Sequence, residues 1–595
     1  MCKKGRFCAS VILLCAVLSV FGASAGKMPF SRFFARKEKE ILARMTLEEK
    51  VGQLLVFGFQ GKTLDGDFEK WLASGRLGNI KIFLRNVEGR AQVKELTRRV
   101  VELERGSRNG IPPFIATDME GGTVNHVRYP GIRLAPAAGL VGATGEAESA
   151  RVSSRLIALT LSDIGVNMNF APCADVLTEP RNTVIMTRSY GSDPELVSAM
   201  VKAFVEEHTK AGILPVMKHF PGHGMTGFDS HVVSDKVDVS RAQMMKVHLL
   251  PYERLIREKV IHACMTAHII YSELDPEHPA TFSRKIVDGL LRNELGFDGL
   301  VVTDELEMEG AAGASKGIVE SFASAFQAGN DLFLVGHTKE KEEKLIESIP
   351  GLFKDGTLSV KELDGKVLRV LAAKKRFLRV FYGPALPSDA ISPSDKTAAG
   401  KTGKPSFEQE YQRAADENRA MAEKGIVLIS SRVKEPIPQY LKGVVDKKRK
   451  GVILSPTEGF GGLAKKYLPD WDVISIGYHP EEEKVGEKIA ASKEKLSSYG
   501  IALIGFSGET HGEWVEACMD AKLPFFILSI ENPFAAGRFS DQALFVVAAF
   551  GPNSPGTDAL FSCVFVTGRF SGRFPYDLKS GVSITSSRPG GRVPG

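Results

Sequence analysis

Short runs of apolar residues alternate along the chain with longer stretches in which hydrophobic residues recur at helical spacing. From about residue 45 to residue 340 there are eight apolar runs, at 51–59, 77–84, 112–118, 166–176, 212–220, 260–268, 298–306 and 329–336. A run that is apolar throughout indicates a strand buried on both faces, and strands that alternate with helices pair in parallel. The pattern predicts an α/β fold whose first part is a (β/α)8 TIM-type barrel.

The pattern changes at 383–407, where proline, serine, glycine and lysine replace the large apolar residues. Such a composition is typical of a linker. Further apolar runs return within 408–578, with helical stretches between some of them, and predict a second domain built as an α/β sandwich. The barrel domain is then expected to span 26–382, and residues 579–595 are expected to form a disordered tail.

The first residues of the chain follow the pattern of a signal peptide over 1–25. Three basic residues precede an apolar stretch at 11–21, and the small residues Ala23, Ser24 and Ala25 follow it. The stretch is short for a membrane span. We expect export to the periplasm or the exterior, with no stable membrane span once the leader is removed. Lipid attachment at Cys15 is a weaker alternative, because a leucine and not a small residue precedes it.

Composition and charge exclude some classes of protein. With 595 residues, 43% of them hydrophobic, the chain is ordinary globular material that is too long for one core. The formal charge of +6 is small, and the basic residues are scattered apart from one short run at 447–450. We therefore expect no nucleic-acid partner. Four widely spaced cysteines follow the leader, and we expect them to be buried thiols.

Polar residues finish several of the predicted strands. They are Asp118, Asp175, Lys218, His219, His268 and Asp304. The chemistry of such barrels lies at the carboxyl ends of the strands, so these side chains are expected to share one face. A carboxylate at the end of a buried strand is costly without partners. Asp304 is therefore either part of a hydrogen-bonded structure or a reacting group, and its place on this face favours reaction.

The stretch KHFPGHGMTGFDSH, which begins at Lys218, concentrates titratable residues. The spacing of Asp229 and His231 lets the carboxylate orient the imidazole as a general acid and base, although the spacing alone favours a simple loop cap. Lys218 and His219 offer donors that suit sugar hydroxyls or an acyl oxygen. His223 lies between two glycines and either holds the loop or contacts substrate. No pair of histidines has the spacing of metal ligands on a strand, so we expect no metal and no cofactor.

The same stretch resembles the signature of the bacterial β-N-acetylglucosaminidases of glycoside hydrolase family 3, of the two-domain type. Other segments agree with this family in the expected order, namely TDMEGGTV at 117–124, GVNMNFAPCADV at 165–176, NTVIMTRSYGSDPELV at 182–197, VVTDELEM at 301–308 and GRFSGRFPYDL at 568–578. The resemblance covers most of the predicted barrel and reaches the end of the second domain.

The resemblance implies roles for individual residues. Asp304 matches the nucleophile, which forms a covalent glycosyl-enzyme intermediate and so gives net retention. His231 matches the acid and base, with Asp229 as its partner. A histidine has the advantage of an ordinary pKa near 6.5. If His231 were not the acid, Glu120 would be the next candidate.

Substrate contacts follow in the same way. Asp118 matches a carboxylate that accepts hydrogen bonds from sugar hydroxyls, whereas Lys218, His219 and Arg188 match donors. These four residues are therefore the expected substrate-binding set.

The chain departs from the family after Asp118. Relatives often read EGGRVxR there, whereas this chain reads EGGTVNH and places Thr123 and His126 at the two arginine positions, with Arg128 nearby but out of register. The contacts made by those arginines, and with them the preference for substrate, are open.

These implications lead to one expected function and several alternatives. We expect an exported, retaining exo-β-N-acetylglucosaminidase that removes terminal N-acetylglucosamine from an amino-sugar glycan or a muropeptide fragment of peptidoglycan. A phosphorylase of the same family is an alternative, because a histidine acid spares phosphate the repulsion of a carboxylate. A β-glucosidase is another. A non-catalytic sugar-binding protein would need neither Asp304 nor the Asp229 and His231 pair. The sequence leaves the oligomeric state undetermined.

Overall fold

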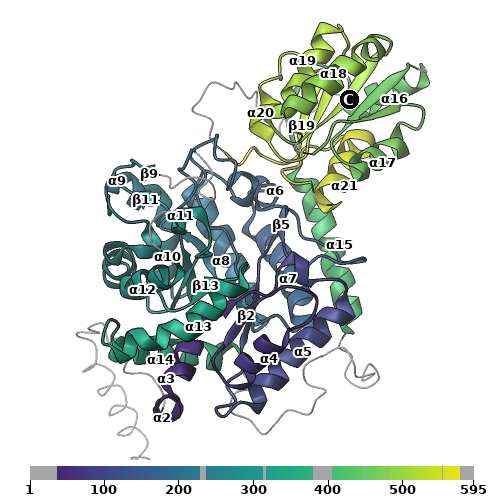
Figure 1. Cartoon of the computed structure of the whole chain (residues 1–595). Coiled ribbons are helices and arrows are strands. Elements are labelled where there is room, and N and C mark those ends of the chain that lie inside the picture. Colours follow the sequence, from purple (N-terminus) through teal and green to yellow (C-terminus); the bar gives the residue numbers. More distant parts are fainter. Residues whose placement is uncertain are drawn as a thin grey trace, which may run out of the picture.

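The computed structural model describes residues 36–227, 236–312, 317–378, 405–447, 449–478, 480, 482–552 and 554–576 (Figure 1). The described chain forms a larger body that ends at residue 378 and a smaller body that follows α15 (Phe407–Gly425). The predicted leader, the tail at 579–595 and the linker up to residue 404 lie outside the described residues. Those boundaries stay predictions.

Each of the eight predicted apolar runs contains a strand. The strands are β1 (Leu55–Phe57), β2 (Asn79–Lys81), β3 (Phe114–Thr117), β6 (Met168–Asn169), β7 (Leu214–Pro215), β8 (Met217–Phe220), β10 (Ala263–Thr266), β12 (Leu300–Thr303) and β13 (Phe333–Val335). The fifth run supplies both β7 and β8. Two small pairs stand apart from them, β4 (Met119–Gly121) with β5 (Val124–Asn125), and β9 (Lys236–Val237) with β11 (Ile270–Tyr271).

The strands of the larger body pair in parallel, as predicted. One sheet has the order β13-β1-β2-β3-β6-β7 and the other has the order β12-β10-β8. Isolated parallel bridges, Cys173 with Lys218 and Val302 with Leu332, occur between strands of the two sheets. The predicted α/β fold is confirmed in the coarser sense of helices alternating with parallel strands. Closure of the strands into one continuous barrel stays a prediction.

Helices connect these strands and cover the sheets (Figure 1). They are α2 (Arg36–Arg44), α3 (Leu47–Gly52), α4 (Gly66–Ala73), α5 (Arg90–Gly106), α6 (Ala138–Ala143), α7 (Ala147–Asp163), α8 (Pro194–Lys210), α9 (Arg241–Gln243), α10 (Leu250–Arg257), α11 (Glu309–Ala312), α12 (Ile318–Ala328), α13 (Lys339–Lys354) and α14 (Val360–Phe377). Between them lie the 3-10 turns η2 (Leu84–Asn86), η3 (Met186–Arg188) and η5 (Ala280–Phe282) and the π-helices η4 (Met244–His248) and η6 (Lys285–Glu294). Local signals begin several of the helices. Asp193, for example, caps α8 by accepting the backbone N–H of Glu195, and Pro194 occupies its first position.

The smaller body has a sheet of its own, with helices between its strands. Its sheet has the order β14-β19-β18-β17-β15-β16, with β14 antiparallel to β19 and the other pairs parallel. The elements are β14 (Val427–Ser431), α16 (Ile437–Asp446), β15 (Gly451–Ser455), α17 (Glu458–Tyr467), β16 (Asp472–Ser475), α18 (Glu482–Ser497), β17 (Ile501–Phe506), η8 (Glu509–His511), α19 (Gly512–Asp520), β18 (Phe525–Ser529), α20 (Pro533–Gly537), β19 (Phe545–Ala548), α21 (Ser554–Ser562) and η9 (Cys563–Thr567).

The two bodies share a contact that the linear pattern does not reveal. Helix α15, which leads into the smaller body, lies along α7 of the larger one, where Arg155 Nη1 is 2.9 Å from Glu417 Oε2 and Asn418 Nδ2 donates to the Val152 carbonyl over 3.0 Å. The apolar core of the smaller body also includes Met186 and other residues of the larger one. Residues of both bodies therefore pack in one core where they meet.

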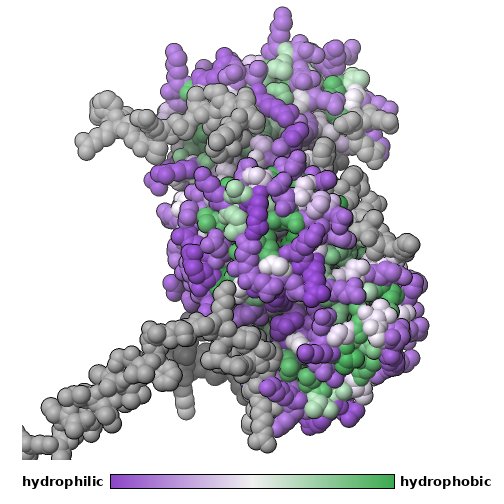
Figure 2. Space-filling view, turned by 90° about the vertical axis from the view of Figure 1, so that its left-hand side faces the viewer, coloured by the Kyte–Doolittle hydropathy of each residue, from purple (hydrophilic) through white to green (hydrophobic). Residues whose placement is uncertain are grey.

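The surface and the cysteines agree with a globular protein. Figure 2 shows hydrophilic residues over most of one face, with hydrophobic ones scattered among them. None of the helices in the described ranges is both long and apolar enough to cross a membrane. Cys173, Cys264, Cys518 and Cys563 are buried free thiols, as expected.

Candidate active site

Asp118 and Glu120 lie on one side of the chain where β4 begins. Side chains alternate along extended chain, so residues two apart share a face. Both carboxylates reach Lys218 on β8, whose Nζ lies 2.7 Å from Asp118 Oδ1 and 2.7 Å from Glu120 Oε1. Lys81, at the end of β2, lies 2.8 Å from Asp118 Oδ2. Burial opposes ionisation, but the charges of Lys218 and Lys81 hold the pKa of Asp118 well below its usual range. Asp118 is therefore a fixed, ionised acceptor.

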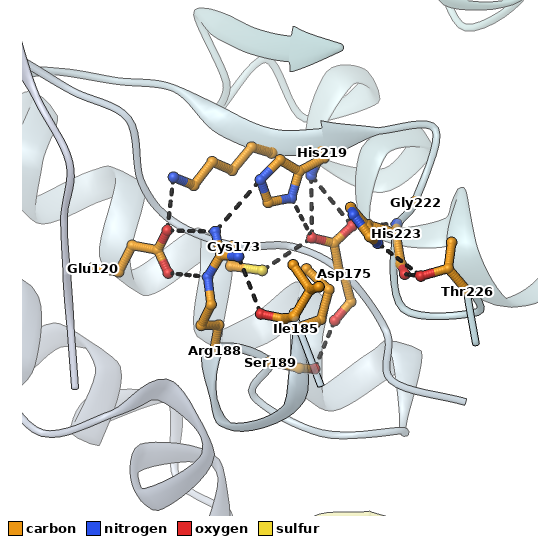
Figure 3. A network of polar contacts seen from close by, with 12 residues as sticks. Glu120, Cys173, Asp175, Ile185, Arg188, Ser189, His219, Gly222, His223 and Thr226 are labelled. Carbon is orange, nitrogen blue, oxygen red and sulfur yellow. Dashed lines mark hydrogen bonds and ion pairs between the residues drawn. The ribbon is translucent and has the colours of Figure 1, made fainter. Parts of the chain in front are cut away.

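Arg188, on the turn η3, grips Glu120 with two parallel hydrogen bonds (Figure 3). Its Nε lies 2.9 Å from Oε2 and its Nη2 lies 2.8 Å from Oε1. Despite burial, the charges of Arg188 and Lys218 lower the pKa of Glu120 to about 2. Such a fork fixes the plane of the guanidinium as well as its position. Nη2 also lies 3.5 Å from His219 Nε2, so all four predicted binding residues lie in one network of contacts.

Asp175 binds the Nδ1 side of the His219 ring (Figure 3). His219 Nδ1 lies 2.7 Å from Asp175 Oδ2, and the backbone N–H groups of His219 and His223 donate to the same carboxylate. Burial alone would raise the pKa of Asp175, but the charge and hydrogen bond of His219, with smaller contributions from His223 and Cys173, together lower it. An ionised carboxylate only accepts, so Nδ1 donates a proton to it and Nε2 faces Arg188. Asp175 thus fixes the orientation of His219.

The loop after β8 contains His223, whose side chain lies in the interior of the protein. His223 is buried, with Nδ1 3.0 Å from Thr226 Oγ1, which supports the structural alternative for this residue. A Cβ atom at Gly224 would lie 2.1 Å from the Val176 carbonyl oxygen, so only glycine fits there. Asp229 and His231 lie outside the described residues, and their roles stay predictions.

Asp304 follows β12 directly and remains partly exposed. Its Oδ1 accepts the backbone N–H of Glu305 over 2.8 Å. Burial raises the pKa of Asp304, but the charges of His219, His268 and Lys218 outweigh it and lower the pKa to about 2. Asp304 is consequently an ionised carboxylate close to the cationic groups that surround Asp118 and Glu120.

Asn169 on β6 is a residue of the site that the sequence did not reveal. Its side chain holds Met119 at both ends, accepting the Met119 N–H over 2.9 Å and donating to the Met119 carbonyl over 3.0 Å. His208 on α8 receives the second amide proton at Nε2 over 3.0 Å, because Nδ1 is engaged with Ser154 Oγ at 2.7 Å. These buried hydrogen bonds hold the backbone at Met119, the residue between Asp118 and Glu120. An asparagine inside an apolar run was the only signal for it in the sequence.

The departure from the family pattern at Thr123 and His126 has a structural outcome. Burial lowers the pKa of His126 to about 4, so the imidazole is neutral near pH 7, with Nδ1 3.5 Å from Asp118 Oδ2. Arg128 donates to the carbonyl oxygens of Thr123 and Asn125, at 2.5 Å and 3.1 Å. Arg128 therefore stabilises the β4–β5 hairpin. The group beside Asp118 is the neutral imidazole of His126.

Two groups among the described residues bring three possible metal ligands within 4.8 Å of one another. The first is Cys173, Asp175 and His219, where Cys173 Sγ donates to Asp175 Oδ2 over 3.0 Å and His219 binds the same oxygen. Burial raises the pKa of the Cys173 thiol, which keeps the proton that it donates to Asp175. The second is Asp275, Glu277 and His278, in which two members are exposed. We interpret the first group as a hydrogen-bonded anchor.

The described part of the site therefore unites Asp118, Lys218, His219 and Arg188, with Asp304 close by. The sequence profile of the glycosyl hydrolase family 3 N-terminal domain matches residues 46–373. The chain belongs to glycoside hydrolase family 3. The resemblance inferred from the motifs, and the expectation of a glycoside hydrolase, are confirmed at the level of family 3.

Individual relatives agree with this assignment. A protein of Tolumonas auensis named β-hexosaminidase is 34% identical over 296 residues, which are 50% of this chain and 86% of that protein. β-Hexosaminidase A of Pseudoalteromonas piscicida is 34% identical over 288 residues, but this match spans only 48% of its length. The structure of a family 3 β-N-acetylglucosaminidase from Paenibacillus sp. FPU-7 has a TM-score of 0.78 and 29% identity, and covers 91% of this chain and 100% of that one. The likeness to that structure extends over both bodies.

Proposed function

We propose that this family 3 member is a retaining exo-β-N-acetylglucosaminidase that removes terminal β-linked N-acetylglucosamine. The observation that carries the proposal is the state of Asp304, an ionised carboxylate with a pKa lowered to about 2, partly exposed at a strand end and close to Lys218 and His219. The names of the relatives support the choice of sugar, since two are β-hexosaminidases and one is a β-N-acetylglucosaminidase. A closed (β/α)8 arrangement of the larger body is part of the same proposal.

The first step forms the covalent intermediate. Asp304 attacks the anomeric carbon while the glycosidic C–O bond breaks, and His231 gives its proton to the departing oxygen. In the second step water attacks the same carbon, the bond to Asp304 breaks and His231 takes the proton from water. Two inversions give retention. Asp229 keeps His231 in the tautomer that this exchange needs.

The charged groups of the site hold the sugar during both steps. Asp118 accepts hydrogen bonds from sugar hydroxyls, while Lys218, Arg188 and His219 supply donors. Because ion pairs already fix these groups, little reorganisation is needed when substrate binds. The natural substrate that we propose is an amino-sugar glycan or a muropeptide fragment of peptidoglycan.

We also propose that the protein is exported. The support is the leader pattern at 1–25, with its basic start, apolar stretch and small residues before the cleavage position. N-terminal sequencing of the protein from its native cell tests this proposal. A mature protein that retains Met1 in the cytoplasm would contradict it.

A panel of aryl glycosides tests the function. We expect turnover of the N-acetylglucosaminide well above that of the glucoside, release of N-acetylglucosamine with retained β configuration, and no dependence on phosphate. Formation of a sugar 1-phosphate would instead identify a phosphorylase, and preference for the glucoside would identify a β-glucosidase. Binding of N-acetylglucosamine without any turnover would identify a non-catalytic protein.

A further inference from the structure

The last described segment of the chain returns from the smaller body to the active-site loops. The Arg573 N–H donates to the Ala143 carbonyl over 2.7 Å, and the Pro575 carbonyl accepts the Ser192 N–H over 3.0 Å. Between these contacts lies the turn η3, which carries Arg188. The segment therefore runs beside the loop that holds one of the substrate-binding residues.

Tyr576 makes the most direct contact with this turn. Its hydroxyl oxygen lies 3.1 Å from the Met186 carbonyl and 3.1 Å from the Ser189 carbonyl, so its one proton bridges both ends of the turn. The Tyr576 side chain is buried. The Met186 carbonyl also accepts the Ser189 N–H over 3.2 Å, so the hydroxyl adds a second donor there and supplies a donor to the Ser189 carbonyl.

The smaller body holds the Tyr576 ring in place. Its centroid lies 5.2 Å from that of Phe534, 5.6 Å from that of Phe574 and 6.1 Å from that of Phe550. Aromatic packing of this kind fixes the plane of a ring. The hydroxyl therefore has one position, and that position is set by the second domain.

The turn needs such support, because its backbone is unfavourable by itself. Met186 has φ +28°, in a region that side chains other than glycine rarely adopt. Residues in such conformations persist only where their surroundings hold them. The same turn is tied to the floor of the site, since Ser189 Oγ donates to the Asp175 carbonyl over 2.6 Å (Figure 3). A shift of the turn would displace Arg188 from Glu120.

We propose that Tyr576 is a positioning residue through which the second domain completes the sugar-binding site. Its hydroxyl holds the turn at 186–189 in the one conformation that presents Arg188 to Glu120 and to substrate. This inference rests on the proposed function only in taking Arg188 as a substrate-binding residue. It assigns the smaller body a role in catalysis without placing any of its side chains on the reacting atoms.

Gly139, on α6, faces the Tyr576 hydroxyl and leaves space for it. A Cβ atom at Gly139, on α6, would lie 2.4 Å from Tyr576 Oη and 3.4 Å from Thr187 Cα. Only glycine leaves room for the hydroxyl between α6 and the turn. Gly139 thus offers a second way to disturb the same contact while the Tyr576 side chain itself is kept.

The test compares Tyr576→Phe with Tyr499→Phe in the full chain. Tyr499 is a matched control, because its hydroxyl donates to Asp472 Oδ2 within the smaller body over 2.5 Å. We expect Tyr576→Phe to raise KM for an aryl glycoside roughly five- to tenfold, which corresponds to the loss of one buried hydrogen bond, while kcat changes less. Tyr499→Phe should keep the parental KM. Circular dichroism and thermal melting verify that both variants are folded.

A double-mutant cycle shows whether Tyr576 acts through Arg188. In an Arg188→Ala background, Tyr576→Phe should change kcat/KM by less than about twofold, because the group that it positions is absent. An undiminished effect in that background would overturn the proposal, and so would a parental KM in Tyr576→Phe alone. If Tyr576→Phe failed to fold, Gly139→Ala would replace it, and a folded Gly139→Ala with parental KM would equally overturn the proposal.

The proposed function can fail separately from this inference. If the parent enzyme preferred another aryl glycoside of the panel, the sugar assignment would be wrong, but the coupling of Tyr576 and Arg188 would then be measured on that substrate. If the effects of Tyr576→Phe and Arg188→Ala on kcat/KM were strongly coupled with that substrate, the positioning role of Tyr576 would stand. Additive effects of the two substitutions would refute it.

Discussion

Asp304 and Glu305 are neighbours along the chain, yet their surroundings shift the pKa values of their carboxyl groups in opposite directions. The charges of His219, His268 and Lys218 outweigh burial and lower the pKa of Asp304 to about 2. Burial, with smaller contributions from Glu307 and Asp304, raises the pKa of Glu305 to about 8 although Lys81 opposes it. Near pH 7 the first carboxyl group is ionised and the second is protonated. The proposed nucleophile therefore carries its charge without a negative charge on the neighbouring Glu305.

Replacement of Asp304 tests the nucleophile. We expect Asp304→Ala to lower kcat by about 10³-fold or more, because the covalent intermediate is lost. A fluorinated mechanism-based sugar should label Asp304 in the parent enzyme, as peptide mass spectrometry can detect. Since its pKa is about 2, Asp304 stays ionised above about pH 4, so the acid limb of kcat/KM should belong to another group. Labelling of a different carboxylate would contradict the assignment.

Glu305→Gln should raise stability, and more so at high pH. A glutamate has an ordinary pKa of 4.5, whereas that of Glu305 in the folded protein is about 8. Between these values the folded chain binds an extra proton, so the contribution of Glu305 to stability is present at low pH and is lost as pH rises to about 8. Glutamine has the shape of the protonated acid but does not titrate. The gain at pH 8 over pH 5 should be on the order of a few kcal/mol, measured by urea unfolding.

Glu307→Gln is the matched control for this prediction. Hydrogen bonds from Thr338 and His337 help to lower the pKa of Glu307 against the effect of burial, and its Oε2 accepts the Gly336, His337 and Thr338 N–H groups. Its contribution to stability is present above the ordinary pKa, so Glu307→Gln should destabilise the protein at pH 7. If both variants changed stability in the same direction, the assignment of a protonated Glu305 would be wrong.

The identity of the acid can be read from the leaving group. A nitrophenolate departs largely unaided, whereas a sugar alkoxide needs a proton. His231→Ala should therefore slow glycosylation by natural disaccharides far more than by nitrophenyl glycosides, provided glycosylation limits both rates. Asp229→Ala should show the same pattern more mildly, because it misorients the imidazole without deleting it. Equal losses on both substrates in pre-steady-state measurements would move the search for the acid to Glu120.

The packing of Gly139 against Tyr576 predicts a compensating pair of substitutions. Gly139→Ala should lower the free energy of unfolding by about 1–3 kcal/mol, because its methyl group would meet the Tyr576 hydroxyl. Tyr576→Phe removes that oxygen, so the same alanine should cost less in the Tyr576→Phe background. Urea unfolding of the four proteins measures the difference. Strict additivity would show that the methyl group and the hydroxyl do not meet.

Much of the fold follows from the pattern of the sequence. The eight apolar runs each contain a strand, and the runs beyond residue 408 form the second sheet. A short run of apolar residues indicates a strand that is buried on both faces. This signal can be read from a few neighbouring residues, without knowledge of the rest of the chain. The polar residues at the strand ends were also found in this way, because a charge that interrupts an apolar run is visible without any structure.

The sequence by itself determined which residue types the site would use, and the tertiary structure decided how they are held. Asp118, Lys218, Arg188 and His219 were predicted from local motifs. Their supports were not, since Asn169 clamps Met119 from 50 positions away and Tyr576 reaches Met186 across 390 positions. A hydrophobic pattern shows that a residue is buried, but not what it is buried against. That choice depends on how distant segments pack, and hydrogen bonds between them form only after the chain has brought their groups together.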